Sequence, residues 1–256
     1  MRRQASRVRC AAVIVAALAA CSSSASPPEG LPALTVHGTE LVLTTVDHRE
    51  LRSAELVGAT LAIGDVDVRL EGIDRDPSAN ERVVQHRFVA VDRQGRTSAL
   101  CEPDAEGKRW AVPLLDDRGR VTLACSSGAI AKCIRWGYRP WPTWPGEPPR
   151  RALHEACIRM VRADYGGDGT PATRDGTRIA FCDRAGVHPC PANGRLEAAW
   201  SPSGATCVAR PRVAELTTLQ QLAARYPRLI GHLGADACTM LTAGSDDRAV
   251  VFSLRI

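Results

Sequence analysis

The stretch that decides the fold is Leu153-His-Glu-Ala-Cys-Ile-Arg-Met-Val-Arg-Ala-Asp-Tyr-Gly-Gly-Asp-Gly-Thr170. Its apolar residues recur at the i, i+3, i+4, i+7, i+8 spacing of one helical face and are Leu153, Ala156, Cys157, Met160 and Val161. This spacing predicts an amphipathic helix that runs to about Tyr165. Gly166 and Gly167 follow, and a glycine just past a helix can close it in the left-handed conformation.

Asp164 is the exception in this predicted helix, because an acid in the last turn faces the negative end of the helix dipole. Three explanations are open: the carboxylate accepts N–H groups of the following loop, it pairs with an arginine, or it binds a ligand. Asp168 and Asp175 lie in or near the same loop, but their order does not match an EF-hand. A calcium site of another geometry remains the alternative to simple Asp-Gly turns.

Four residues of this stretch are candidates for function: His154, Asp164, Tyr165 and Asp168. His154 lies one helical turn from Cys157, so the two could form a base and a nucleophile. Against this, a cysteine on the apolar face of a helix in an exported protein is the usual partner of a disulfide. A hydrolase would instead use the acids, Asp164 and Asp168, around one substrate cleft.

The first 20 residues predict export. Four arginines precede an uncharged run from Ala11 to Ala20, which is shorter than a membrane span and suits the core of a signal peptide. Leu18-Ala-Ala-Cys21 resembles the bacterial lipobox, which implies lipid attachment at Cys21. Ser22 after Cys21 permits transport onward to an outer membrane, if the cell has one. We therefore expect residues 1–20 to be a signal peptide and the protein to be a lipoprotein on the exported side of the cell envelope.

The charge of the chain belongs mainly to this signal. Removal of residues 1–20 takes away four arginines and no acids, so the formal net charge falls from +5 to +1. A nearly neutral domain lacks the dense cationic surface that nucleic-acid binding needs. Residues 21–32 are rich in serine and proline and predict a tether, and residues 33–256 are expected to form a single globular domain. The predicted partners are thus the membrane, through the lipid, and a protein or glycan ligand.

Eight cysteines remain beyond Cys10 and Cys21, and an even number in an exported protein predicts four disulfides. Because eight cysteines allow 105 pairings, the sequence leaves the connectivity open. The eight are Cys101, Cys125, Cys133, Cys157, Cys182, Cys190, Cys207 and Cys238. The chain contains no Cys-x-x-Cys pair, phosphate loop or dinucleotide fingerprint, so we expect neither a metal nor a cofactor. His188 beside Cys190 offers a metal ligand only as the alternative to a disulfide.

The remaining sequence predicts short antiparallel strands around two or three helices, an α+β, β-rich, disulfide-stapled fold. The predicted strands cover residues 40–46, 60–63, 66–70, 83–91, 120–125, 177–182, 196–200, 205–209 and 249–254. Gly64-Asp65 and Ser201-Pro-Ser-Gly204 are hairpin turns. Residues 216–226 predict a second helix, whereas residues 128–137 fit either a short helix closed by Gly137 or irregular chain.

Two segments together resemble the bacterial ADYC-domain family. They are Cys125-Ser-Ser-Gly-Ala-Ile-Ala-Lys-Cys-Ile-Arg-Trp-Gly-Tyr-Arg-Pro-Trp141 and Leu153-His-Glu-Ala-Cys-Ile-Arg-Met-Val-Arg-Ala-Asp-Tyr165. The order of features is shared over residues 85–210, including Asp175-Gly-Thr177 and Glu197-Ala-Ala-Trp200. The family is exported and has no established activity. Its motif continues Ala-Asp-Tyr-Cys-Gly-Asp-Gly, so Gly166 replaces the motif cysteine here.

Taken together, the sequence predicts a lipid-anchored protein of the cell envelope that acts as a binding or structural module. The alternative is an extracytoplasmic hydrolase that uses the acids Asp164 and Asp168. The signal and the cysteine count favour the first hypothesis, and no catalytic motif in the chain favours the second.

Overall fold

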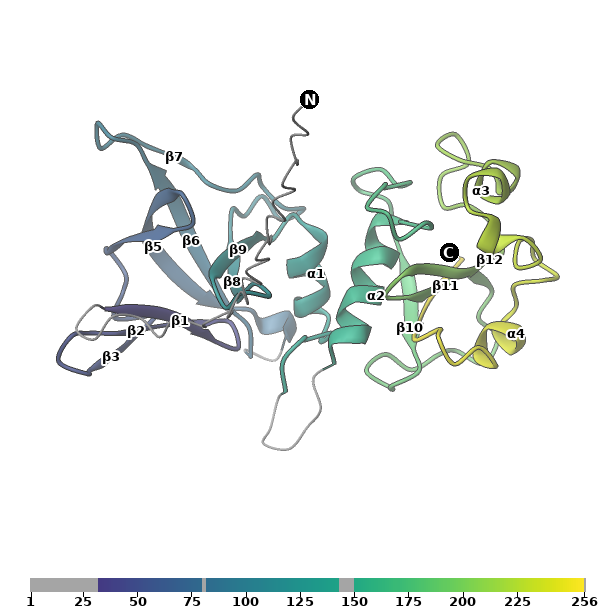
Figure 1. The fold of residues 1–256 in the computed structure, drawn as a ribbon, viewed down its shortest axis with the longest axis horizontal. Helices are drawn as coiled ribbons and strands as arrows, with labels where there is room; N and C mark the ends of the chain where they lie inside the picture. Colours follow the sequence, from purple (N-terminus) through teal and green to yellow (C-terminus); the bar gives the residue numbers. More distant parts are fainter. Residues whose placement is uncertain (1–31, 80–81, 143–149, 256) are drawn as a thin grey trace, which may run out of the picture. The chain divides into compact units, whose positions relative to one another are not determined.

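The structure is a computed structural model that describes residues 32–79, 82–142 and 150–255. The signal peptide, Cys21, most of the tether, and Trp144 lie outside the described residues. Within these ranges the chain forms antiparallel sheets and short helices (Figure 1), which confirms the predicted α+β, β-rich fold. No helix in the described part of the chain is long and apolar enough to cross a membrane.

The first half of the chain forms two sheets that share a core. The smaller sheet has the order β1-β2-β3, and the larger has the order β4-β5-β6-β8-β9, with β7 paired to β6. Apolar side chains from both sheets, including Leu41, Leu70 and Phe88, pack together and are buried. The strands are β1 (Ala33–His37), β2 (Glu40–Thr44), β3 (Glu50–Arg52), β4 (Thr60–Ile63), β5 (Val66–Arg75), β6 (Val84–Val91), β7 (Thr97–Ala99), β8 (Ala111–Leu115) and β9 (Val121–Cys125).

Local turn chemistry accounts for the hairpins in this half. Ile63 pairs with Val66, which leaves the predicted two-residue turn Gly64-Asp65, and Gly64 has the positive φ that this turn needs. In the turns that begin at Asp92 and Asp116, the aspartate accepts the N–H groups two and four residues later. Turn residues near each other in sequence therefore fix the register of these hairpins.

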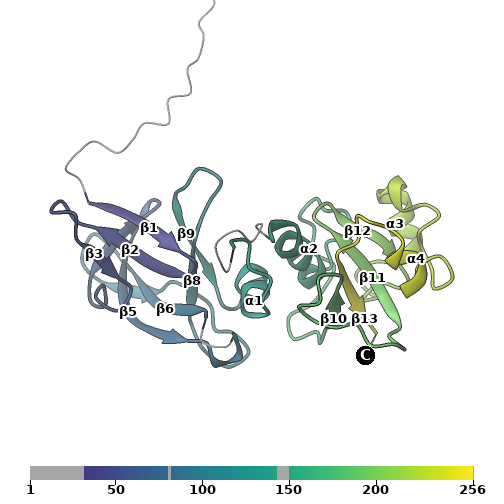
Figure 2. The same ribbon diagram turned by 90° about the horizontal axis from the view of Figure 1, so that it is seen from below.

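The second half is a single four-stranded sheet covered by helices (Figure 2). Its order is β10-β13-β11-β12, and α2 packs across β11, β12 and β13. The elements of this half are α2 (Arg151–Arg162), β10 (Ala180–Asp183), β11 (Leu196–Ser201), β12 (Gly204–Val208), α3 (Leu219–Arg225), α4 (Met240–Gly244) and β13 (Val251–Leu254), with a short 3₁₀ turn η2 (Pro227–Leu229). Helix α1 (Ala129–Arg135) packs against β9 and against α2, and its buried residues form a small core with the 3₁₀ turn η1 (Pro77–Ala79).

The predicted central helix forms, but its ends differ from the prediction. Helix α2 spans Arg151–Arg162, and its predicted apolar face is buried against the sheet. The helix ends three residues earlier than expected, because Ala163 rather than a glycine takes the left-handed conformation, with φ of 48°. Asp164 therefore lies beyond the helix and not in its last turn. The second predicted helix begins later, at Leu219, because Thr218 and Gln221 form a capping box.

The eight cysteines form four disulfides, as predicted, and the structure supplies their pairing. The pairs are Cys101–Cys125, Cys133–Cys157, Cys182–Cys190 and Cys207–Cys238. Cys133–Cys157 ties α1 to α2, and both residues are fully buried. Residues 128–137 contain the helix α1, which resolves the alternative left open by the sequence. Disulfides of this number fit an extracytoplasmic protein.

Candidate functional site

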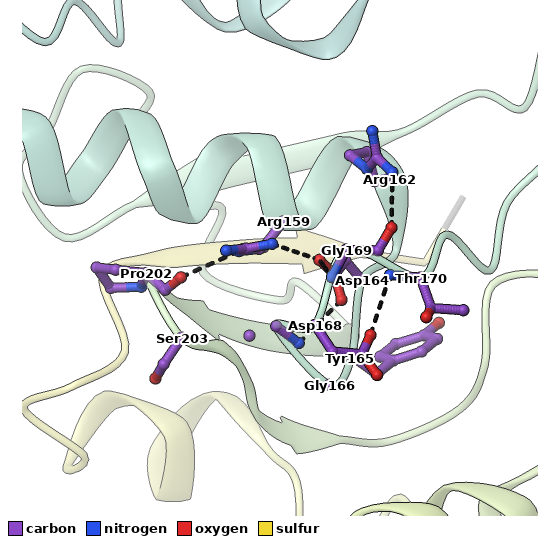
Figure 3. Close-up of polar contacts among 12 residues, drawn as sticks. Arg159, Arg162, Asp164, Tyr165, Gly166, Asp168, Gly169, Thr170, Pro202 and Ser203 are labelled. Carbon is purple, nitrogen blue, oxygen red and sulfur yellow. Dashed lines mark hydrogen bonds and ion pairs between the residues drawn. The ribbon is translucent and has the colours of Figure 1, made fainter. Parts of the chain in front are cut away.

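The candidate site is the glycine loop, residues 163–170, which reverses the chain after α2 (Figure 3). The reversal begins at Ala163, whose left-handed conformation lets the Asp164 N–H donate back to the Arg159 carbonyl oxygen at 2.9 Å. This turns the chain away from the helix axis and directs the loop toward the turn between β11 and β12. The loop is thus placed by the helix end and by one sheet turn.

The Asp164 carboxylate is fully buried and is used within the loop. Its oxygens accept the N–H groups of Gly167 and Gly169, each at 2.9 Å, and Arg159 donates to it at 2.5 Å (Figure 3). Arg159 also donates to the Pro202 carbonyl oxygen at 3.1 Å. Two of the three sequence explanations therefore hold at once: Asp164 caps the loop and pairs with an arginine. A buried charge needs both kinds of partner.

Tyr165 is the apolar anchor of the loop. Its ring is 2% exposed and stacks on Trp200, with ring centroids 5.3 Å apart. Its hydroxyl oxygen accepts the Arg212 N–H at 2.8 Å, and burial together with the nearby Glu197 charge raises the pKa of this phenol. The phenol is therefore neutral, and its role is to pack and to hold the chain near residue 212.

A buried ion pair behind the loop was not predicted from the sequence. Arg212 donates to both oxygens of Glu197, at 2.8 and 3.3 Å, and its side chain is 2% exposed. The same guanidinium donates to the Met160 and Val161 carbonyl oxygens, so it caps the C-terminal end of α2. Ser253 also donates to Glu197 at 3.1 Å. Glu197 is among the features shared in the resemblance noted above, but no sequence pattern pairs it with Arg212.

Glycines let the loop approach its neighbours closely. A Cβ atom at Gly167 would lie 2.0 Å from the Ser203 carbonyl oxygen, and Gly167 also has a φ of +73°. At Gly166 a Cβ atom would lie 2.3 Å from the Tyr226 ring. Arg228 holds the loop at this position, because its guanidinium donates to the Tyr165 carbonyl oxygen at 2.7 Å. A larger side chain therefore does not fit at either glycine, because the Ser203 backbone blocks it at Gly167 and the Tyr226 ring blocks it at Gly166.

Asp168 lies at the outer edge of the loop. Its side chain is 42% exposed, and it accepts hydrogen bonds from the Thr170 N–H, the Arg225 guanidinium and the Tyr226 hydroxyl, at 3.0 to 3.1 Å. The Thr170 N–H and the other donors lower the pKa of Asp168 to about 2. This carboxylate is ionised at neutral pH and is a weak base. Because Asp164 is buried and Asp168 is at the surface, the two acids do not face one substrate position.

A disulfide excludes the base and nucleophile roles that the sequence suggested for the other candidate pair, His154 and Cys157. Cys157 is bonded to Cys133, so it has no thiol to activate. His154 is 6% exposed and lies 2.7 Å from the Tyr138 carbonyl oxygen, and burial lowers the pKa of its imidazole. Sequence reasoning placed His154 on no particular face, and the structure places it in the core.

The imidazole of His188, which the sequence offered as an alternative metal ligand, is also hydrogen-bonded within the protein. Its Nε2 atom lies 2.6 Å from the Trp136 carbonyl oxygen, and the neighbouring Cys190 is in a disulfide. Asp183 nearby accepts the Tyr138 hydroxyl and the N–H groups of Val187 and His188. Among the described residues, no group of three or more His, Cys, Asp or Glu side chains is placed to hold a metal ion.

A cleft of about 510 Å³ adjoins the glycine loop. It lies between the loop and α3, and we call it the α3 cleft. Its lining is part apolar and part polar, with the guanidinium of Arg225 at one side. The lining residues are Ala163, Tyr165, Thr170, Pro171, Ala172, Leu216, Thr217, Gln221, Leu222, Ala224, Arg225 and Tyr226. A volume of this size is typical of a site for a small ligand or for one segment of a larger one.

These features define a class of protein: a disulfide-stapled α+β domain in which a glycine loop joins the end of a central helix to a β-hairpin. The ADYC domain family matches residues 49–214, more than half of the chain, and the chain belongs to that family. The match covers the glycine loop and Glu197 and Arg212 behind it. Comparisons with curated proteins and with solved structures gave no significant match.

The buried position of Asp164 leads to a stability prediction. Asp164→Asn keeps the shape but removes the charge that Arg159 and two N–H groups contact, so we expect a loss of about 3 kcal/mol in the free energy of unfolding. The matched control is Asp168→Asn, which removes an exposed charge and should cost less than about 1 kcal/mol. Urea unfolding at neutral pH measures both. Equal losses for the two variants would contradict the assignment of Asp164 as the structural acid.

The contact between Gly166 and Tyr226 gives a second prediction. Gly166→Ala should destabilise the protein by about 1–3 kcal/mol, because the added methyl group displaces the Tyr226 ring. The cost should largely disappear in a Tyr226→Ala background, which leaves space for the methyl group. Thermal unfolding of both single variants and the double variant measures this coupling.

Gly167→Ala is the control for that coupling. Its methyl group meets the Ser203 backbone, which Tyr226→Ala does not move, so no rescue is expected. If Tyr226→Ala reduces the loss of stability of both alanine variants equally, a specific steric contact between position 166 and the Tyr226 ring is contradicted.

Proposed function

We propose that this chain is a lipid-anchored protein of the bacterial cell envelope, whose domain binds a protein or glycan partner or serves as a structural module. The basic, apolar and lipobox segments that end at Cys21 support export and anchoring. Four disulfides are consistent with an oxidising compartment outside the cytoplasm. In a cell with an outer membrane, the domain would act in the periplasm or at the outer membrane.

One observation carries the proposal of a binding or structural module: the polar groups of the glycine loop are used to hold the fold. Asp164 is fully buried, Tyr165 is stacked in the core, and the ion pair of Glu197 with Arg212 caps α2. What remains accessible beside the loop is the α3 cleft, where shape and hydrogen bonding can select a ligand.

The hydrolase alternative needs two acid or base groups that reach one substrate. Asp164 does not meet this requirement because its carboxylate has no exposed surface. Asp168 is accessible, but its pKa of about 2 makes it unsuited to donate a proton at neutral pH. These positions therefore favour the binding module over the hydrolase.

The residue at position 166 adds support. Gly166 stands where the family motif is expected to have a cysteine, and the Tyr226 ring occupies the space that a side chain there would need. This chain therefore has no thiol at position 166 for an activity that would depend on one. The end of α3 instead contributes Arg225 and Tyr226 to the lining of the cleft.

The anchor is tested at Cys21. We expect mass spectrometry of the membrane fraction to find the mature N-terminus at Cys21 with acyl chains on the sulfur and the amino group. Cys21→Ala should release the domain from the membrane and leave its unfolding temperature unchanged. A protein that is soluble and free of lipid, and that Cys21→Ala does not alter, would show that the signal is of the ordinary cleaved kind.

The α3 cleft is tested by photo-crosslinking in the cells that make the protein. A benzoylphenylalanine at Leu216, a cleft residue that is 46% exposed, should give one discrete protein or glycan adduct. The matched control is Val57, which is 45% exposed and does not line the cleft. The same adduct at both positions, or none at either, would refute the cleft as the binding surface.

A further inference from the structure

The disulfide between Cys182 and Cys190, which we call the loop disulfide, differs from the other three in its surroundings. Cys190 is exposed, whereas the other seven cysteines that form disulfides are buried or partly buried. It lies in a run of five exposed residues, 189–193, outside the helices and strands. Its partner Cys182 belongs to β10 and is fully buried. The loop disulfide therefore has one end at the surface and one end in the core.

The loop between the two cysteines is held by hydrogen bonds as well as by the disulfide. The Asp183 carboxylate accepts the N–H groups of Val187 and His188 at 3.0 and 2.6 Å, and the Asp183 N–H donates to the His188 carbonyl oxygen at 3.0 Å. The His188 Nε2 atom lies 2.6 Å from the Trp136 carbonyl oxygen. Because these contacts do not involve either sulfur, we expect the loop to keep its place when the disulfide opens.

The surroundings of Cys190 also favour an incoming thiolate. A cavity of about 500 Å³ begins at Pro191, the next residue in the chain, and its lining includes Arg195 and Arg255. Among the residues that the structure describes, this lining contains no acid. Disulfide exchange proceeds by attack of a thiolate, and positive charge nearby favours this anionic form. The cavity shares no lining residue with the α3 cleft, so the site is independent of the proposed function above.

From this geometry we propose that the loop disulfide exchanges with a dithiol, and that Cys190 is the residue attacked. One thiolate of the dithiol forms a bond to the Cys190 sulfur while the bond from Cys190 to Cys182 breaks. The Cys182 sulfur leaves as a thiolate and takes up a proton, because it lies in an apolar cluster that disfavours charge.

The second thiolate of the dithiol then resolves the mixed disulfide. It bonds to the sulfur of the first, and Cys190 is released and takes up a proton. The dithiol is oxidised to its own disulfide and the loop disulfide is reduced to two thiols, so two electrons and two protons pass from one to the other. The other three disulfides lack an exposed cysteine and should not exchange while the protein is folded.

The order of reduction tests this proposal. The unreduced mature protein is treated with limiting dithiothreitol at neutral pH without denaturant, and thiols are alkylated at intervals and assigned by mass spectrometry. We expect Cys182 and Cys190 to be labelled together, at least about tenfold faster than the other six cysteines. The proposal is overturned if another pair is labelled first, or if all eight are labelled together because reduction follows global unfolding.

Two single variants test which sulfur is accessible. Cys182→Ser leaves the Cys190 thiol, which should react with dithionitrobenzoate in the folded protein. Cys190→Ser leaves the buried Cys182 thiol, which should react only after a denaturant is added. Equal reaction of the two folded variants would contradict the assignment of Cys190.

A pair of double variants tests whether the loop holds without its disulfide. Cys182→Ser/Cys190→Ser should keep cooperative unfolding, with an unfolding temperature within a few degrees of the parent protein. The matched control is Cys133→Ser/Cys157→Ser, which removes a fully buried link between α1 and α2 and should lower the unfolding temperature much more. An equal or larger loss for Cys182→Ser/Cys190→Ser would make the loop disulfide a structural bond and overturn the proposal.

Discussion

Three arginine side chains hold the chain reversal after α2, and the second half of the fold depends on this arrangement. Arg212 satisfies carbonyl groups at the helix end, Arg159 neutralises buried Asp164, and Arg228 donates to carbonyl groups on the loop and the facing hairpin. A helix end leaves carbonyl groups without partners, and burying them requires donors. Guanidinium groups supply several donors each, so three of them fix the loop, the helix and the sheet together.

This arrangement explains why the most distinctive residues of the chain are structural. An acid such as Asp164, buried beside glycines, resembles a catalytic group in sequence, but here its charge is compensated by Arg159 and by N–H groups of the loop. The disulfide between Cys133 and Cys157 fixes α2 against α1. The helix α2 is therefore held along its length by the sheet and α1, and at its C-terminal end by Arg212.

Much of the fold was predictable because its signals are local. The apolar spacing of α2, the turn at Gly64 and the hairpin that closes at Gly204 depend on residues near each other in sequence. The site was less predictable. His154 is buried and Asp164 is paired, but helical spacing alone did not show which carbonyl group or arginine each one meets. The end of α2 was wrong by three residues, because Ala163 takes a conformation that glycine usually takes.

The sequence by itself determined the α+β class, the position of the central helix and the presence of four disulfides, because periodicity and cysteine number need no knowledge of distant contacts. Only the tertiary structure decided which cysteines pair, that Arg212 meets Glu197, and that the Tyr226 ring fills the space beside Gly166. These contacts join segments far apart in the chain. The sequence gives no reason to prefer one cysteine pairing, or one arginine as the partner of Glu197, over another. Packing in three dimensions selects among them.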